Sequence, residues 1–185
     1  MLSLSTPPAG EPLPLPDIKQ ALRVETDADD ALILRMAQTA RAFLERRLDL
    51  AILPQEWTLS LDALPARPVS LRPGKVARIT AGSVTYGEGE PRALTSSDYT
   101  LCRSWPANVA FRLPHEQGGE RVTALSLTFE TGWADAEAVP PDLLHALRLL
   151  TAHYYEEREP FARGAYVPVP AALQAHIEAF REVRL

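Results

Sequence analysis

A histidine followed by two glutamates near the end of a predicted helix is the best candidate for chemistry in the sequence. Within HYYEERE, residues 153–159, His153 precedes Glu156 by three positions and Glu157 by four. Residues with these spacings are neighbours on a helix surface. An imidazole beside a carboxylate could bind a metal ion that activates water, so the pattern suggests a metal-assisted hydrolase.

The rest of such a metal site is missing from the sequence. The other helical histidine, His145, lies eight residues earlier, about 12 Å away along a helix axis. The paired-histidine pattern of zinc proteases and the paired Glu-x-x-His pattern of di-iron bundles are both absent. We therefore interpret residues 153–159 as the solvated side of a packed helix. A hydrolase that uses His153 and Glu157 remains an alternative.

Other catalytic patterns are absent as well. The sequence has no Gly-x-x-x-x-Gly-Lys phosphate-binding loop, no dinucleotide-binding glycine pattern and no Gly-x-Ser-x-Gly nucleophile elbow. Asp29 and Asp30 form a pair of carboxylates, but acidic residues are favoured at the start of a helix for electrostatic reasons alone. We therefore expect no enzyme activity, no cofactor and no metal site.

Composition and charge favour a folded protein over a nucleic-acid-binding or membrane protein. The 185 residues suit one domain with a sizeable insertion, and 46% of them are apolar. The net charge of −5 gives no overall basic character for gripping DNA. A single cysteine, Cys102, excludes an internal disulfide framework. Since no signal peptide and no apolar run of about 18 residues is apparent, we expect folding in a cytoplasm.

Three helices are predicted, two before and one after a region of short strands. A short helix begins at Asp17, and a longer one follows that Thr26 or Asp27 can cap. Apolar residues recur along the longer helix every three or four positions and form one face. The third helix starts at Pro140, because proline fits a first turn, and it ends at Glu159 before another proline.

Between the helices the apolar period changes to two, which is typical of half-buried strands. EWTLSLD places Trp57 and Leu59 on one side, and in RVTALSLTFETG the residues Leu125, Leu127 and Phe129 alternate with polar ones. Roughly six or seven short strands of this kind predict a small antiparallel sandwich or barrel.

The predicted fold class is α+β, a small helical bundle core with an antiparallel β insertion, sandwich-like or barrel-like, between helices two and three. Prolines are frequent near both ends, so we expect extended N- and C-terminal arms. The expected boundaries are an arm at 1–16, a main domain at 17–160 with helices at 17–50 and 140–159 and the β insertion at 55–132, and a tail with a short helix at 161–185.

Four residues are candidates for contacts between subunits. Leu34 points away from the apolar face of its helix. Arg47 and Arg158 fall on the apolar sides of the second and third helices, near the helix ends. The commoner explanation is that each arginine lies along the surface or pairs with a carbonyl at the helix end. The alternative is that each arginine contacts a neighbouring chain. His153 lies near Arg158 and completes the set.

The order of these segments resembles the head–tail connector, or adaptor, proteins of long-tailed phages and gene transfer agents. The resemblance covers roughly residues 14–160. Its elements are a Lys-Leu-Arg first helix, an acidic helix start leading to Glu-Arg-Arg, a Trp-Thr-Leu strand, a Tyr-Gly hairpin, a Gly-Trp strand end and a proline-started helix ending near Tyr-Glu-x-Arg-Glu. The matching residues are Lys19, Leu22, Arg23, Asp29, Asp30, Glu45, Arg46, Arg47, Trp57, Thr58, Leu59, Tyr86, Gly87, Phe129, Gly132, Trp133, Pro140, Tyr155, Glu156, Arg158 and Glu159.

This resemblance implies a structural role in a virion, at the junction of capsid and tail, for a protein made in a bacterial cytoplasm. Such proteins form a ring, usually of twelve copies, beneath the portal protein. The ring extends the DNA channel and meets a tail-side stopper or tail-terminator protein. The implied partners are therefore the portal protein, the tail-side protein and other copies of the chain, while DNA passes through without specific binding and no membrane is involved.

The C-terminal tail is expected to bind the portal, since a C-terminal segment docks there in related assemblies. Aromatic and arginine residues, the types that anchor interfaces, occur in this tail. The expected portal-binding residues are Phe161, Tyr166, Phe180, Arg181, Arg184 and Leu185.

The net charge suggests how such a ring would treat DNA. Charges of −5 per subunit that face inward would make the channel acidic, so that DNA slides instead of binding. A competing interpretation of the same segments is a monomeric β-sandwich binding module with helical supports.

Overall fold

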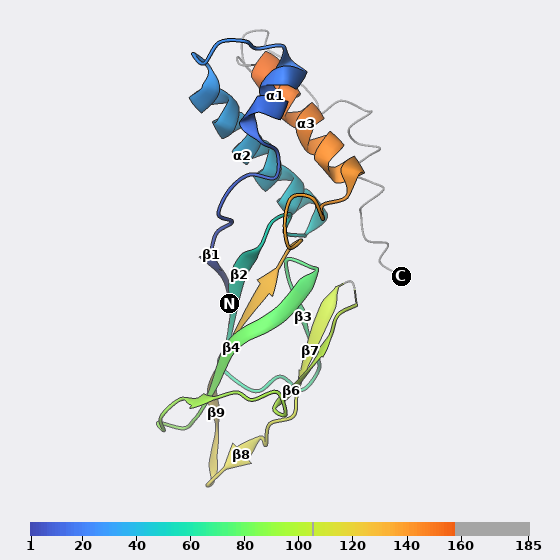
Figure 1. The fold of residues 1–185 in the computed structure, drawn as a ribbon. Helices are drawn as coiled ribbons and strands as arrows, with labels where there is room; N and C mark the ends of the chain where they lie inside the picture. The colour runs from blue at the N-terminus through green and yellow to red at the C-terminus, as the bar shows by residue number, and fades with distance from the viewer. Residues whose placement is uncertain (105, 158–185) are drawn as a thin grey trace, which may run out of the picture. The chain divides into compact units, whose positions relative to one another are not determined.

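The computed structural model describes residues 1–104 and 106–157 of the chain. The chain divides into two compact units, each built from two separate stretches (Figure 1). Met1–Ala9 and Leu53–Trp133 make the sheet unit, and Gly10–Ile52 makes the helical unit together with residues from Ala134 onward. The α+β class is confirmed: the described residues form three helices and two antiparallel sheets, with all strands but the first between helices two and three.

Through residue 157, the helical unit contains α1 (Leu15–Leu22), α2 (Asp30–Leu48) and α3 (Pro141–Glu156), which pack against one another. Along α2 a small or apolar residue is buried every three or four positions, as the sequence predicts. Each fully buried leucine or isoleucine contributes about 1.5–3 kcal/mol to the stability of this core. The buried apolar residues of the three helices are Ile18, Ile33, Ala37, Ala40, Leu44, Leu48, Leu143, Ala146, Leu147 and Leu150.

The start of α2 differs from the prediction that Thr26 or Asp27 caps it. The first helical residue is Asp30, and Asp29 occupies the N-cap position without a capping side-chain bond. Asp27 instead accepts a hydrogen bond of 2.6 Å from the ammonium of Lys19 on α1. Asp27 therefore bonds to α1 and does not cap α2.

In the described residues, the sheet unit contains nine strands in two antiparallel sheets (Figure 1). The larger sheet has the order β1-β2-β9-β4-β5, with β8 paired to β9, and the smaller sheet has the order β3-β7-β6. The strands are β1 (Leu2–Thr6), β2 (Gln55–Leu61), β3 (Val69–Leu71), β4 (Val76–Tyr86), β5 (Arg92–Ala93), β6 (Tyr99–Cys102), β7 (Ala107–Phe111), β8 (Glu116–Gln117) and β9 (Glu120–Thr131).

The central strand β9 shows how the two sheets pack. Leu127 and Phe129 are fully buried, whereas Ser126 between its apolar neighbours is only half-buried, as the alternation predicts. Leu127 and Phe129 share one hydrophobic cluster with Leu71 and Val109 of the smaller sheet. The apolar sides of the two sheets therefore face each other, and the predicted sandwich-like insertion is present.

The N-terminal residues form a strand where the sequence suggested an extended arm over 1–16. Strand β1 pairs antiparallel with β2, with Leu2 opposite Leu59 and Leu4 opposite Trp57. The alternating segment LSLST precedes the first prolines, so these prolines end the strand and do not prevent it. The arm is thus reduced to the connection between β1 and α1.

The third helix buries one apolar stripe. Leu143, Leu147 and Leu150 are buried, whereas Tyr154 is only half-buried. Thr151 is buried in its place, and its hydroxyl donates a hydrogen bond of 2.8 Å to the carbonyl of Leu147. None of the helices described by the structure is long and apolar enough to cross a membrane.

Candidate functional site

The end of α3 does not assemble a metal site around His153. The helix ends at Glu156, and Glu157 lies beyond it, with its backbone N–H donating to the carbonyl of His153 at 3.0 Å. Both glutamates are exposed, and the His153 ring lies beside that of Tyr154, with centroids 6.0 Å apart. Over residues 1–104 and 106–157, no three His, Cys, Asp or Glu side chains are grouped to hold a metal ion. This geometry gives metal-assisted hydrolysis no support.

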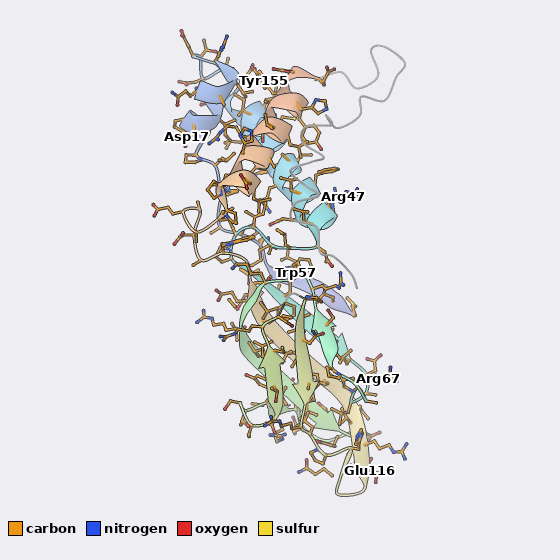
Figure 2. All side chains as sticks on the ribbon, turned by 90° about the vertical axis from the view of Figure 1, so that its right-hand side faces the viewer. Asp17, Arg47, Trp57, Arg67, Glu116 and Tyr155 are labelled. Atoms are coloured by element: carbon orange, nitrogen blue, oxygen red, sulfur yellow. The ribbon has the colours of Figure 1, made fainter. Side chains whose placement is uncertain are left out.

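The Asp29–Asp30 pair joins helices at the start of α2. The hydroxyl of Tyr155 on α3, labelled in Figure 2, donates a hydrogen bond of 2.6 Å to Asp29. The Lys19 ammonium on α1 lies 2.7 Å from Asp30. The hydrogen bond between Lys19 and Asp27 raises the pKa of the lysine and lowers the pKa of the carboxyl. These contacts fasten α2 to both other helices, so the acidic pair has a structural role.

A second polar network holds the chain on both sides of α2. The Arg41 guanidinium donates to both oxygens of Glu11, at 2.8 and 3.1 Å, and to Glu45 at 2.9 Å. Glu45 also accepts a bond of 2.9 Å from the backbone N–H of Ile52. Burial opposes the charge of Arg41, but its bonds to Glu11 and the charge of Glu45 outweigh burial and raise the pKa of Arg41. The Glu11 carboxylate thus holds the segment before α1 against α2, and the Glu45 carboxylate holds the segment after α2.

The four candidate interface residues do not form one patch. Leu34 and Arg47 are thirteen residues apart on α2, which corresponds to about 20 Å along the helix axis. Leu34 is half-buried, and Arg47 is exposed on the last turn (Figure 2). The Tyr155 contact places the end of α3 beside the start of α2, so half-buried His153 lies toward the end of the bundle nearer Leu34. Arg158 lies outside the described residues, as do the expected portal-binding residues Phe161, Tyr166, Phe180, Arg181, Arg184 and Leu185.

Gly132 and Trp133, which directly follow the end of β9, also have a structural role. Gly132 has φ +109°, and a Cβ there would collide with the carbonyl oxygen of Leu53. Trp133 is 9% exposed, and the Lys75 ammonium lies 4.8 Å from the centre of its ring, a cation–π contact. Gly132 therefore allows two backbone segments to approach closely, and Trp133 packs as a buried aromatic side chain.

Near the tip of the β8–β9 hairpin, where Figure 2 labels Glu116, His115 and Glu116 line a hollow of about 310 Å³ with Arg121. The guanidinium of Arg121 pairs with Glu116 at 3.0 Å, and both side chains are largely exposed. An exposed ion pair of this kind contributes little energy. Because its charged groups already face each other, the hollow offers no convincing binding site.

An exposed apolar edge at β1 was not expected from the sequence. The large apolar side chains that the described residues expose are Met1, Leu2, Leu4 and Leu149. Leu2 and Leu4 lie opposite Leu59 and Trp57, and residues directly opposite in an antiparallel pair share a face of the sheet. The apolar face of the larger sheet therefore continues onto β1. The alternation in LSLST was the available signal, and the following prolines obscured it.

Comparison with known proteins gives matches among solved structures. No protein-family model matches the chain, and no curated protein sequence matches it. A chain from the neck of an empty gene transfer agent (GTA) particle computed with C6 symmetry is 28% identical, with a TM-score of 0.81, and the match covers 100% of this chain and 97% of that one.

Two further structures agree with this match. A chain from the virion of a native GTA particle is 29% identical with a TM-score of 0.79, and one from the neck of a native GTA particle computed with C12 symmetry is 28% identical with a TM-score of 0.78. Each match covers 100% of this chain and 97% of the other. Over its whole length, therefore, this chain is similar in sequence and structure to chains of the neck and virion of gene transfer agent particles.

Proposed function

We propose that the chain is a structural protein of the virion neck, a head–tail adaptor that forms a ring beneath the portal protein of a gene transfer agent or related phage. The observation that carries the proposal is the full-length match to a neck chain at 28% identity and a TM-score of 0.81. The polar contacts support it as well, because those around Lys19 and Glu45 hold the fold together instead of forming a reaction centre.

The ring would contain twelve copies and join the portal to a tail-side stopper or tail-terminator protein at the capsid–tail junction. Matched neck structures computed with C6 and C12 symmetry support a cyclic arrangement of copies. A cyclic ring needs two different surfaces on each subunit, one for each neighbour. Leu34 and His153 lie toward one end of α2 and Arg47 toward the other, so they suit two separate contacts better than one.

The distribution of charge supports a channel that DNA passes through without sticking. The sheet unit has eight acidic and eight basic residues, whereas the helical unit through residue 157 has thirteen acidic and seven basic ones. Tight binding of DNA depends on neutralising phosphates with lysine and arginine. We propose that the helical unit lines the channel. A reconstruction in which arginines line the channel wall would contradict this assignment.

The proposed function can be tested by co-expressing the chain with the portal protein of the same particle. Twelve copies of a 20.4 kDa chain should add about 245 kDa to the portal complex, which native mass spectrometry can measure. A reconstruction by electron microscopy should then show a ring of this fold under the portal. If the chain and the portal separate on purification and no ring is seen, the adaptor function is wrong.

The tail can be tested in the same complex. Deleting Ala165–Leu185 should abolish attachment to the portal, because it removes five of the six expected anchors. The circular dichroism and thermal unfolding of the remaining chain should stay close to those of the full chain. A variant with Phe180 and Arg181 replaced by alanine should weaken attachment without shortening the chain. Attachment that survives the deletion would refute docking through the tail.

A further inference from the structure

Strand β1 leaves one edge of the larger sheet open in the part of the chain that the structure describes. The strand order places β1 and β5 at the two ends of that sheet, and β3 and β6 at the edges of the smaller one. Strand β1 has five residues, against two in β5, three in β3 and four in β6. Of these four end strands, β1 is therefore the longest.

The register of β1 shows which backbone groups face outward. The backbone nitrogen of Met1 donates to the carbonyl of Ser60 at 2.6 Å, and the N–H of Ser60 donates to the carbonyl of Met1 at 2.8 Å. Pairs that exchange both bonds alternate along an antiparallel ladder with pairs that exchange none. Ser3 therefore bonds to β2, while the N–H and C=O groups of Leu2 and Leu4 point toward the open edge.

The same two residues expose apolar side chains. Leu2 is 39% exposed and Leu4 is 45% exposed, and no charged side chain occurs between Met1 and Thr6. Soluble proteins normally protect an open edge with charges, prolines, bulges or very short strands, because an unprotected edge pairs with other chains. Most of β1 lacks this protection: its irregularity falls only between Leu4 and Thr6, and its prolines begin at position 7.

We infer that the open edge of β1 pairs with a strand of a second copy of this chain. The inference rests on the proposed ring and names one of its contact surfaces. A ring repeats the same contact between every two neighbours, so pairing of this apolar edge with the next copy would cover it around the whole circle. Backbone bonds from Leu2 and Leu4 would fix the alignment, and their side chains would add buried apolar area.

The sheet unit also contains an edge that can receive β1. Strand β6 borders the smaller sheet, and the N–H of Arg112 donates to the carbonyl of Asp98 at 2.7 Å, next to the start of β6. By the same alternation, the backbone groups of Tyr99 and Leu101 point outward. This two-residue spacing equals that of Leu2 and Leu4. A copy of the chain therefore offers a compatible strand that is distinct from β1, as a cyclic contact requires.

Backbone pairing at Leu4 can be tested with a proline. Leu4→Pro removes an outward N–H and leaves the bonds of Ser3 to β2 intact, and proline is tolerated in an edge strand in this orientation. We expect it to reduce the yield of rings on the portal by about tenfold or more. Leu4→Val, which keeps the N–H and a β-favouring apolar side chain, should form rings normally. Equal thermal unfolding of the isolated variants would show that β1 remains folded.

Hydrogen exchange tests the unmodified protein. The amide of Leu4 should exchange quickly in the isolated chain and about tenfold or more slowly in the ring, while that of Ser3 should be protected in both. A photo-crosslinking amino acid at position 4 should yield an adduct of two chains. Rings with an unprotected Leu4 amide, or an adduct with the portal, would overturn this inference and leave the adaptor function standing. Failure of the wild-type chain to form any ring would overturn both.

Discussion

Replacing Gly132 with alanine should destabilise the sheet unit strongly, because two separate penalties coincide at this position. Its φ of +109° is a conformation that residues with a side chain rarely adopt. An added Cβ would also collide with the carbonyl oxygen of Leu53 and lie 2.6 Å from its carbonyl carbon and 3.1 Å from the nitrogen of Pro54. These atoms belong to the backbone, so no rotation of a side chain can relieve the collision.

The two penalties can be estimated separately. A positive φ costs a residue with a Cβ about 1–2 kcal/mol, and forcing extra volume into a packed site costs about 1–3 kcal/mol. The free energy of unfolding should therefore fall by about 2–5 kcal/mol, a large share of the 5–15 kcal/mol that is typical of folded proteins. For a chain of this size the unfolding midpoint should drop by roughly 4–20 °C.

Two other glycines provide matched controls. Gly118 has φ +62° but nothing within 4 Å of an added Cβ, and Gly10 has neither penalty. Urea titrations monitored by tryptophan fluorescence should show the largest loss of stability for Gly132→Ala, a smaller loss for Gly118→Ala and the smallest for Gly10→Ala. Trp133, which adjoins Gly132 and is 9% exposed, should report the transition. If Gly132→Ala loses no more stability than Gly118→Ala, the collision with Leu53 does not govern this site.

Three further predictions concern polar contacts. Arg41→Met should lower the free energy of unfolding by about 3 kcal/mol, because Glu11 loses its partner in a partly buried site; adding Glu11→Gln should restore part of the loss, and purely additive effects in urea titrations would contradict the coupling. Tyr155→Phe should cost about 1 kcal/mol in the same assay, since it removes the hydroxyl bond to the start of α2; an unchanged midpoint would contradict that bond. The hydrogen bond from Arg92 is the main cause that lowers the pKa of Asp98 from 3.8 to about 2. The stabilisation that ionised Asp98 gives the folded state is therefore complete above pH 3.8 and lost as the pH falls through about 2. The wild type and Asp98→Asn should differ in free energy of unfolding near neutral pH and converge in acid. A difference that stays constant from neutral pH to pH 2 would refute the role of this ion pair.

Local periodicity in the sequence predicted the elements whose burial repeats within a few residues. The alternation around Leu127 and the three-to-four spacing around Ile33 both reappear in the structure. Strand β1 was missed because its partner Leu59 is far away in the sequence, while the prolines that suggest an arm are close by. The start of α2 was misplaced for a similar reason, since Asp27 binds Lys19 on another helix and does not cap its own.

The candidate site was less predictable than the fold. Helix geometry alone separates Leu34 from Arg47, so their distance follows from the sequence once α2 is assumed. The roles of Asp29 and Arg41 do not follow, because they depend on Tyr155 and on Glu11. Such polar contacts join residues from different elements, and no short-range pattern marks them. The surfaces that would meet a neighbouring chain leave still less trace, since a single sequence does not contain the partner.

The interleaving of the two units along the chain has a consequence for folding during synthesis. Neither unit is continuous: β1 precedes α1 and α2, and the remaining strands precede α3. Because the ribosome adds about 5–20 residues per second, α3 is synthesised roughly 5–20 s after α1 and α2, whose core it completes. Strand β1 likewise emerges long before β2, and its loop-closure cost is met only when both are available. Nascent chains on one messenger therefore carry an unpaired apolar strand and an incomplete bundle at the same time, and a chain that stops before β9 completes neither unit.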